Sequence, residues 1–511
     1  MHVIGCDIGS QGVKARIVSA AGETVAEASS GYAIDYPRPT WAEQWPDVWL
    51  RAIEDAVRAV LASGGVRPSE IRAIGLAAQN DGVVAIDKGG APLRPAILWL
   101  DRRAVVQCKE AEEAKGSLDT FGLTGLNLDP AHVGPKIRWI ADNQPDVFER
   151  ATHFLLPGSY IGYHLTGELA VDYSNASSSL LMDLRRREWS PALCELFAVP
   201  ESLLAPIRPS TEVLGTLRRD VAQSLGLTDD TLVMVGGGDE HVAALGAGVL
   251  RPGLVLDVAG TAEAVGLASA DLVFDPGRLV ESHCHAHPDL WLIEHPGFVS
   301  GANYRWFRDQ FAPAEIAAAR DHETGAYELL DEGAARIAPG SDGLLMLPCL
   351  MGAATPTWNA SIRGTFLGFT LSHTREHFIR AVLEASAYAV RDIIDQMRSM
   401  GCELTEIRVV GGGARSRLWR QIKADVVGLP VVNPLTPETT SLGAAMIALV
   451  GIGAFASLEE AADTMVVIDE RLVPDPANHA IYEESYASYR EAYFALVPVF
   501  ERAASVRREA G

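Results

Sequence analysis

The sequence has little positive charge for its length, and this shortage excludes one class of partner. Lys and Arg together number 43, against 66 Asp and Glu, which leaves a formal net charge of -23 at pH 7. A chain this acidic has no general attraction for a phosphate backbone or an anionic membrane. We therefore expect neither a nucleic-acid partner nor a membrane partner.

Cysteine is also scarce, and long apolar runs are missing. The six cysteines are scattered without a Cys-x-x-Cys pair, which disfavours both a disulfide framework and a zinc ribbon. No segment approaches the roughly 20 apolar residues that cross a bilayer, and the first residues lack the basic start and apolar core of a signal peptide. We expect a protein of the reducing cytoplasm.

What remains is the composition of a large globular protein. The chain has 511 residues, 48% of them hydrophobic and 21% charged, and is about three times as long as a typical domain. Strand patterns alternate with helical patterns, which predicts an α/β architecture. A boundary near residue 250 divides the chain about equally, so we predict domains at 1–249 and 250–511.

Two hairpin patterns indicate that the halves are related. Residues 3 to 8 form a strand pattern, Gly9-Ser10-Gln11-Gly12 a turn, and residues 13 to 18 alternate apolar with Lys14 and Arg16. A second arrangement of this kind begins at residue 254 and turns at Gly260-Thr261. The sequence therefore predicts one hairpin in each half.

Helical periodicity is clearest in two other segments. Residues 47 to 61 can line one helix face with Val48, Ile53 and Val57. The charged segment from 483 to 509 predicts a surface helix. Its packing residues are expected to be Tyr486, Tyr489, Tyr493 and Phe494.

The first motif that can carry chemistry is Asp7-Ile8-Gly9-Ser10-Gln11-Gly12. Its glycines allow backbone N–H groups to turn toward an anion, while Asp7 is placed to hold Mg²⁺ through water. The alternative is an ordinary hairpin turn capped by Asp7. The repetition around Gly260-Thr261 favours a phosphate site.

Two further glycine turns each lead from a strand pattern into a helical one. Gly236-Gly237-Gly238 delivers Asp239 at a helix start, where Asp also serves as an ordinary N-cap. Capping needs no glycines, however, whereas close approach of a substrate does. The turn Gly411-Gly412-Gly413-Ala414-Arg415-Ser416 can admit adenine and ribose, and it has neither the Walker lysine nor the Rossmann spacing.

In this order, the motifs resemble those of the FGGY carbohydrate kinases, members of the actin-hexokinase superfamily. Trp41-Ala42-Glu43-Gln44, the stretch Arg94 to Trp99 with Asp101 and Arg103, and Gly364 to Phe369 look like stretches of the xylulokinases of that family. The resemblance covers roughly residues 3 to 450. It implies two actin-like (ribonuclease H-like) α/β domains, each with a central five-stranded sheet, around an interdomain cleft for Mg-ATP and a small sugar.

The resemblance also implies a set of site residues. Asp239 would be the catalytic base and would share the Mg²⁺ site with Asp7. The implied substrate contacts are Gln79, Asn80, Asp81, Trp99, Asp101, Arg103 and Asp239. The implied ATP contacts are Ser10, Gln11, Lys14, Gly260, Thr261, Gly412, Gly413, Ala414 and Ser416. Members occur as monomers and as dimers, so a homodimer is also an expectation.

The substrate is implied to be a pentulose such as D-xylulose, but one segment departs from the family pattern. Gln79-Asn80-Asp81-Gly82 stands where xylulokinases usually have Gln-Met-His-Gly. Asp81 can accept hydrogen bonds from vicinal hydroxyls, and Gln-Gly-Asp-Gly occurs in erythritol-type kinases, so a linear polyol or another ketose stays open. An actin-like ATP-binding protein without kinase activity is the alternative from a different class, and Asp239 argues against it.

The remaining candidates have structural alternatives. The histidines of His283-Cys284-His285-Ala286-His287 would share one strand face and could bind a metal, although a strand that merely borders the sugar cleft is the favoured interpretation. The side chains of Glu240 and His241 either reach the substrate or face solvent or a neighbouring strand. The closely spaced aromatic residues Trp291, Tyr304, Trp306 and Phe307 are expected to fill the core rather than to stack on a sugar.

Overall fold

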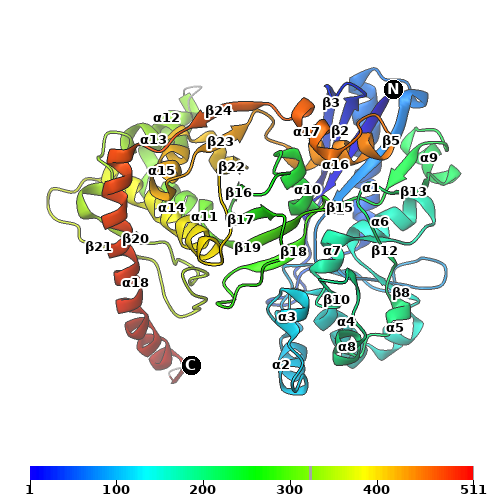
Figure 1. Ribbon diagram of the computed structural model, residues 1–511, viewed down its shortest axis with the longest axis horizontal. Helices are drawn as coiled ribbons and strands as arrows, with labels where there is room; N and C mark the ends of the chain where they lie inside the picture. The colour runs from blue at the N-terminus through cyan, green and yellow to red at the C-terminus, as the bar shows by residue number, and fades with distance from the viewer. Residues whose placement is uncertain (322–324, 510–511) are drawn as a thin grey trace.

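The computed structural model describes residues 1–321 and 325–509 and shows two lobes, each built around one large mixed sheet (Figure 1). The first sheet contains β1 (His2–Ile8), β2 (Gly12–Ser19), β3 (Thr24–Gly31), β5 (Ile71–Ala78), β13 (Val213–Thr216), β14 (Leu232–Met234) and β15 (Gly237–Gly238). The second contains β16 (Leu254–Ala259), β17 (Ala262–Ser269), β18 (Glu281–Cys284), β19 (Trp291–Val299), β22 (Glu406–Val410), β23 (Val431–Pro434) and β24 (Ile468–Leu472).

The two sheets share one topology, as the paired hairpins predict. In the first, the order β3-β2-β1-β5-β14 places three antiparallel strands beside two that run parallel to β1. The order β19-β17-β16-β22-β23 repeats this plan in the second. The described part of each sheet has seven strands rather than the five expected. In the first sheet β13 extends one edge and β15 pairs with the end of β5, and in the second β18 and β24 extend the two edges.

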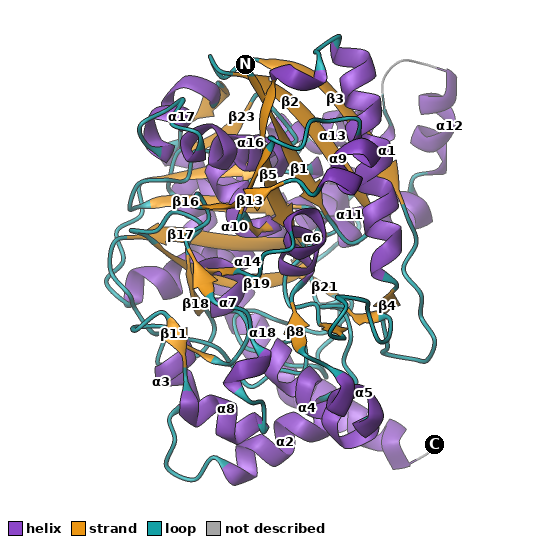
Figure 2. Ribbon diagram, turned by 90° about the vertical axis from the view of Figure 1, so that its right-hand side faces the viewer, coloured by secondary structure: helices purple, strands orange, loops and turns teal. Residues whose placement is uncertain are grey.

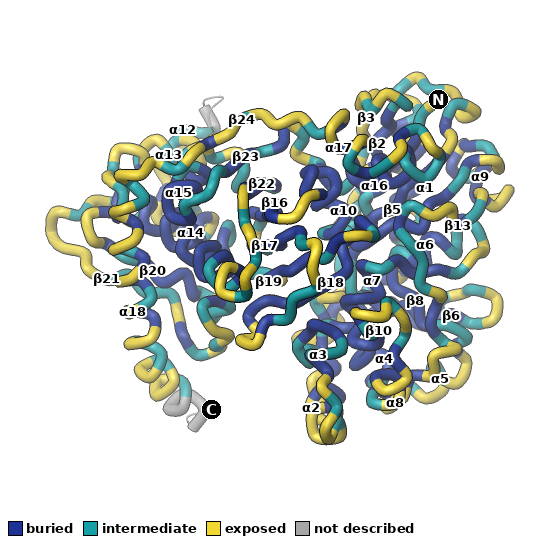
Figure 3. The backbone as a smooth tube through the Cα atoms, in the orientation of Figure 1, coloured by how far each residue is buried: buried dark blue, intermediate teal, exposed yellow. Residues whose placement is uncertain are grey.

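Helices surround both sheets, and the buried backbone follows the sheets and the helices packed on them (Figures 2 and 3). Those of the first half are α1 (Pro46–Gly64), α2 (Val105–Ala114), α3 (Thr120–Thr124), α4 (Val133–Asn143), α5 (Pro145–Arg150), α6 (Pro157–Thr166), α7 (Tyr173–Ser177), α8 (Pro191–Phe197), α9 (Arg219–Leu225) and α10 (Asp239–Gly246). Those of the second half are α11 (Gly301–Phe311), α12 (Pro313–Asp321), α13 (Ala326–Ala334), α14 (Arg375–Ser399), α15 (Arg417–Val427), α16 (Thr439–Gly451), α17 (Leu458–Met465) and α18 (Pro476–Glu509). Among the described helices, none is long and apolar enough to cross a membrane.

Local patterns account for the elements that the sequence predicts, with small differences. The hairpin turn closes where the N–H of Gly9 donates to the carbonyl of Gly12 at 3.0 Å. Arg16, expected on the polar side of its strand, is buried because its guanidinium bonds Ser441 and pairs with Glu27. In α1 the buried face contains Trp49 rather than Val48.

The C-terminal helix confirms most of one prediction and corrects the rest. Tyr486, Tyr489 and Tyr493 of α18 are buried against the second lobe. Phe494 is 49% exposed, so its predicted packing role is wrong. The tyrosines fall at helical spacing on the inner face, and residue 494 has already turned away from it.

One helix of the second half lies on the sheet of the first. A Cβ added to Gly5 in β1 would lie 2.1 Å from the carbonyl oxygen of Ser441, and one on Gly75 in β5 would lie 1.8 Å from that of Ala444. These glycines therefore let α16 contact the sheet backbone directly, and Figures 1 and 2 show it beside β1 and β5. The predicted domain boundary at 249/250 assigns α16 to the second domain, although the helix packs on the first sheet. The boundary itself stays a prediction.

Candidate active site

Asp7 and Asp239 are carried to the same edge of the first sheet. In the parallel pairing of β1 with β5, Asp7 lies opposite Ala77. The short strand β15 pairs with the same end of β5, with Gly237 opposite Ala77, and leads directly into α10 at Asp239. The ends of β1 and β15 therefore flank β5 and hold both carboxylates in one region.

The glycines before Asp239 let this segment pack closely against β5 and the loop that follows it. Gly236 has a φ of 84°, and a Cβ there would lie 2.4 Å from the carbonyl oxygen of Leu76. A Cβ on Gly238 would lie 2.0 Å from Oδ1 of Asn80. Gly238 is the N-cap of α10, so Asp239 is the first helical residue rather than the cap. The N–H of Glu240 donates to Oδ1 of Asp239 at 2.9 Å.

Three buried carboxyl groups, those of Asp7, Asp239 and Glu240, have raised pKa values. Burial, reinforced by the charge of Asp239, raises the pKa of Asp7 to about 7. Burial raises the pKa of Asp239 to about 6 and that of Glu240, next to Asp239, to about 8. Desolvation and like charge both disfavour the ionised forms, and a cation bound nearby would reverse this effect.

The loop after β5 carries three buried oxygen acceptors and packs against the start of α10. Oε1 of Gln79, Oδ1 of Asn80 and Oδ1 of Asp81 are buried, and none finds a hydrogen-bond donor among the described residues. The contact of Asn80 with Gly238 puts this loop against the start of α10. Buried acceptors of this kind normally have partners, so their arrangement suits a ligand that donates several hydrogen bonds.

Asp81 is held by two residues that the sequence did not single out for the site. Nδ1 of His132 lies 3.5 Å from Oδ2 of Asp81, and Nζ of Lys136 donates to the Asp81 carbonyl at 2.6 Å. Although burial opposes the charged ring, the carboxylate of Asp81 raises the pKa of His132 to about 9. Burial lowers the pKa of Lys136 to about 8, with Asp81 opposing. Both residues lie more than 50 positions along the chain from Asp81, so no local pattern reveals the contact.

Trp99, Asp101 and Arg103, predicted to contact the substrate, have different surroundings. The indole of Trp99 is 43% exposed and donates to the hydroxyl of Ser10 at 2.8 Å. Asp101 is fully buried, and its oxygens accept from the N–H of Ala42 and from Arg103. Arg103 also pairs with Glu43 at 2.7 Å. The direct substrate role of Asp101 and Arg103 stays a prediction, and their geometry favours support of the loop that carries Trp99.

The first-hairpin residues predicted to bind ATP lie at the same edge as Asp7. The carbonyl of Ser10 accepts from Nε2 of Gln44 at 2.8 Å, and the carbonyl of Gln11 accepts from the N–H of Tyr32 at 3.0 Å. Lys14, opposite Asp7 in the hairpin, forms an ion pair with Glu438 just before α16. Lys14 therefore links the hairpin to the second half of the chain.

The remaining predicted ATP residues form a second group. Parallel pairing sets Val258 of β16 opposite Val410 of β22, so the turn at Gly260–Thr261 lies beside the turn after β22. Gly411 has a φ of 83°, and a Cβ there would lie 2.9 Å from the carbonyl oxygen of Ala259. Gly412, Gly413 and Ala414 form a short 3-10 helix, and Ser416 caps α15 by accepting from the N–H of Trp419 at 3.0 Å.

A buried ionic triad beneath these turns was missed by the sequence analysis. Nζ of Lys423 in α15 lies 2.6 Å from Oδ2 of Asp257 and 2.6 Å from Oε1 of Glu263. Burial and the charge of Glu263 raise the pKa of Asp257 to about 8, with Lys423 opposing. The triad joins both strands of the second hairpin to the helix that follows the third glycine turn.

The histidine run does not form the three-histidine face that alternation predicts. β18 ends at Cys284, and Nδ1 of His285 accepts from the N–H of His287 at 2.9 Å. The ring of His287 reaches Glu459 at 3.0 Å. His283 instead lies against His241 of α10, with ring centroids 5.5 Å apart, and beside Glu294 of β19. Burial lowers the pKa of His241 and of His283 to about 3, so both rings are neutral.

The later aromatic residues mostly behave as core. Tyr304 and Phe307 are buried in the second lobe, and the hydroxyl of Tyr304 donates to Asp331 at 2.8 Å. Trp306 is partly buried beside them. Trp291 is partly buried with the guanidinium of Arg187 4.4 Å from its ring centroid.

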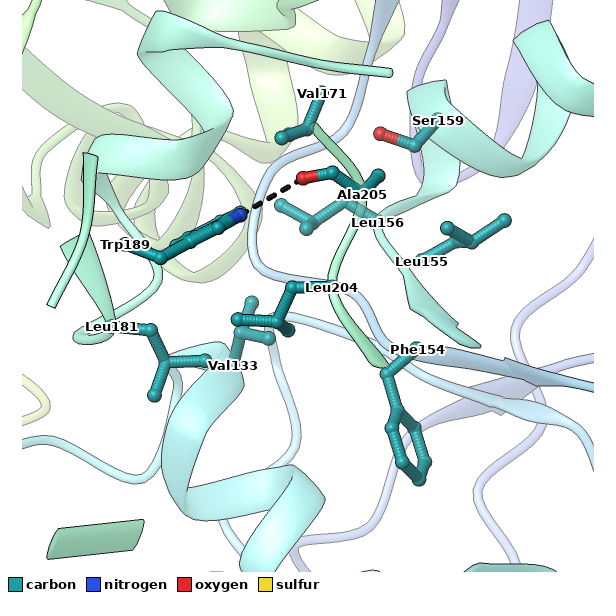
Figure 4. Close-up of a pocket in the computed structure, with 10 residues that line it drawn as sticks. All are labelled: Val133, Phe154, Leu155, Leu156, Ser159, Val171, Leu181, Trp189, Leu204 and Ala205. Carbon is teal, nitrogen blue, oxygen red and sulfur yellow. Dashed lines mark hydrogen bonds between the residues drawn. The ribbon is translucent and has the colours of Figure 1, made fainter. Parts of the chain in front are cut away.

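An apolar cavity in the first lobe is separate from all of these residues (Figure 4). Its volume is about 10 Å³, which suffices for one water but not for a sugar. The indole N–H of Trp189, one of its lining residues, donates to the carbonyl of Ala205 at 2.9 Å. The cavity is therefore a packing defect rather than a binding site.

Comparison with known proteins places the chain among sugar-phosphorylating enzymes. The FGGY family of carbohydrate kinases matches with its N-terminal domain over residues 2–246 and with its C-terminal domain over residues 256–452. A xylulose kinase of Staphylococcus epidermidis is 31% identical over 494 residues, 96% of each chain. A gluconokinase of Bacillus subtilis is 30% identical over 502 residues, 98% of this chain and 94% of that one. The crystal structure of a xylulose kinase from Rhodospirillum rubrum, 31% identical, has a TM-score of 0.90 and covers 98% of this chain and 100% of that one.

Proposed function

The chain belongs to the FGGY family of carbohydrate kinases, and on that premise we propose that Asp239 is the base that activates the sugar hydroxyl. The protein is an ATP-dependent sugar kinase, a phosphotransferase with an alcohol acceptor. A sugar hydroxyl is a poor nucleophile, and phosphoryl transfer depends mainly on alignment and charge stabilisation. A carboxylate with a pKa near 6 is ionised at neutral pH yet still able to accept a proton.

The observation that carries this proposal is the set of unpartnered acceptors in the loop that packs against the start of α10. A polyhydroxylated substrate brings the hydrogen-bond donors that Gln79, Asn80 and Asp81 need. The same contacts would align one hydroxyl with Asp239. Trp99 contacts the first hairpin through its bond to Ser10.

Mg-ATP fits the two groups of residues at the strand ends. Asp7 and Asp239 provide the oxygen ligands that Mg²⁺ takes, directly or through water, and their raised pKa values reflect charge that a cation would offset. When bound, Mg²⁺ would stabilise the charge on the phosphates. We assign the phosphates and adenosine to the turns of the two hairpins and the third glycine turn, through Ser10, Gln11, Lys14, Gly260, Thr261, Gly412, Gly413, Ala414 and Ser416.

The substrate that we propose is a neutral pentulose such as D-xylulose. Sequence identity alone does not distinguish a pentulose from a sugar acid as the substrate. The xylulose kinase is 31% identical to this chain and the gluconokinase is 30% identical. A sugar acid, however, would add negative charge to a region that already holds Asp7, Asp81 and Asp239. The two buried basic side chains beside Asp81 are already engaged, because His132 pairs with its carboxylate and Lys136 donates to the carbonyls of Asp81 and Ala131. A neutral sugar avoids this repulsion.

A second candidate is a linear polyol of the erythritol type or another ketose. The observation that favours it is the pair Asn80 and Asp81, whose free oxygens accept hydrogen bonds from vicinal hydroxyls without requiring a carbonyl group. Tetritols and pentitols provide such hydroxyls. The proposed chemistry at Asp239 is the same for both candidates.

The deciding experiment is an ADP-release screen of the purified chain with Mg-ATP across pentuloses, hexuloses, pentitols, tetritols, glycerol and gluconate. We expect one strong responder among the neutral pentuloses. A strong tetritol or pentitol response would favour the second candidate, and a gluconate response would overturn the charge argument. ADP release that needs no added sugar would contradict sugar-kinase activity itself.

A further inference from the structure

We propose that His241, His283 and Glu294 form a binding site for one divalent transition-metal ion of the zinc class. The three side chains come from α10, β18 and β19, so the site joins the helix that begins at Asp239 to the sheet of the second lobe. This inference goes beyond the Mg-ATP chemistry proposed above and uses none of its residues.

The distances between donor atoms suit a single ion. One potential ligand atom from each residue can be chosen so that all three lie within 4.8 Å of one another. Ligands about 2.1 Å from a tetrahedral zinc are separated by roughly 3.4 Å. Nε2 of His283 and Oε1 of Glu294 are already 3.2 Å apart, so modest rotation of His241 would complete the triangle.

The hydrogen bonding of the three residues is incomplete in a way that a cation would complete. His241 is fully buried, and neither of its ring nitrogens has a partner among the described residues. Oε2 of Glu294 has none either, and the approach of His283 to Glu294 lacks hydrogen-bond geometry. Buried polar atoms without partners are costly, which makes a ligand a better explanation than packing.

The donor set selects the class of ion. Two neutral imidazoles and one carboxylate match the ligands of catalytic zinc sites, which leave a fourth position open. Mg²⁺ and Ca²⁺ prefer oxygen ligands, so they fit this set poorly. The site is therefore distinct in chemistry from the Mg²⁺ site proposed at Asp7 and Asp239.

The neighbouring charges agree with a bound cation. Glu240 and Glu281 interact electrostatically with Glu294, and Oε2 of Glu281 lies 3.9 Å from the ring of His283. His132 is the basic side chain that acts on His283 from the first lobe. A divalent ion would offset the excess of carboxyl groups on this side of the junction.

The test is metal binding by the full chain, free of any affinity tag, after chelator treatment and in excess Mg²⁺. Zn²⁺ is titrated against a chromophoric chelator without nucleotide or sugar, so the result does not depend on the kinase proposal. We expect about one equivalent of Zn²⁺ per chain. Co²⁺ in its place should give the visible absorption bands of a low-coordinate site.

Variants locate the site. Glu294→Gln and His283→Asn should each weaken Zn²⁺ binding by at least about ten-fold. His287→Gln is the matched control, because His287 belongs to the same run but pairs with Glu459 instead. It should bind as the unaltered chain does.

Two results would overturn the proposal. One is binding of less than about a fifth of an equivalent by the unaltered chain, a measurement that needs no variant to fold. The other is an equal loss of affinity in His287→Gln and in folded Glu294→Gln, which would indicate adventitious binding. Melting curves of each variant, recorded without metal, establish that it is folded.

Discussion

Substitution of Asp239 by Asn tests the centre of the proposed mechanism. Asn keeps the size of the side chain and an oxygen that can accept from the N–H of Glu240, but it cannot take up the proton of the attacking hydroxyl. Loss of a general base lowers rates by about 10²-fold to 10⁴-fold, equivalent to roughly 3 to 5 kcal/mol in the barrier. We expect turnover to fall by this factor while ATP binding changes little.

The pH dependence sharpens this prediction. The base acts in its ionised form, and its raised pKa of about 6 moves the acid limb of the rate profile upward from the usual range near 4. Such a group is ionised in about nine molecules in ten at pH 7 and in about one in ten at pH 5. kcat/KM of the unaltered chain should therefore fall about ten-fold between those two pH values.

The assay is steady-state ADP release with the best sugar from the screen, from pH 5 to 8 and at Mg-ATP well below its KM, so that kcat/KM reports the pKa of the chain without bound Mg²⁺. ATP binding is measured separately by calorimetry. Asp220→Asn is a matched control, because Asp220 also lies in the first turn of a helix, α9, but is exposed. The reasoning would be refuted if Asp239→Asn turned over at a near-normal rate, or if its residual activity kept the acid limb near pH 6.

Three further predictions concern packing, charge and nucleotide binding. Gly75→Ala should lower the free energy of unfolding by about 3 kcal/mol in a urea titration, because its Cβ would lie 1.8 Å from the Ala444 oxygen. Gly412→Ala, whose Cβ meets nothing within 4 Å, should leave it unchanged. The folded pKa of His132, about 9, lies above its unfolded value, so its stabilisation is complete below about pH 6.5 and lost as pH rises through 9. In urea titrations, His132→Gln should therefore lower the free energy of unfolding more at pH 6 than at pH 9.5, by up to about 3 kcal/mol. An equal loss at the two pH values would contradict a charged ring. In Gly413→Ala the new Cβ would lie 2.8 Å from the Cβ of Ala259. We expect this variant to raise KM for ATP about ten-fold with a smaller effect on kcat. An unchanged KM would show that this turn does not belong to the nucleotide site.

Local signals made much of the fold predictable. Each hairpin is specified by two-residue alternation and a glycine turn within about 20 residues, and the start of α10 is specified by Gly238 and the residues just after it. The repeat of these signals was enough to predict two related halves. Arg16 was misassigned to a polar face because its partner Ser441 lies 425 positions away.

The site was predictable only where its residues lie within motifs. Asp7, Asp239 and the loop from Gln79 to Asp81 meet at one sheet edge because they follow neighbouring strands. His132 and Lys136 reach that loop from α4 and the residue before it, and Glu294 reaches His283 from the next strand. Such contacts depend on how elements dock, which no periodicity encodes.

The crossing of α16 onto the first sheet has a consequence for synthesis on the ribosome. The first lobe is complete only when residues 439–451 have emerged, about 200 residues after its own sheet has been made. At 5 to 20 residues per second, this interval lasts roughly 10 to 40 s. Until then, the face around Val3, Ala73 and Leu245 has no covering helix and is open to chaperones. Nascent chains stalled before Thr439 should therefore be cut readily by protease, and protection at that stage would show that the first lobe matures without α16.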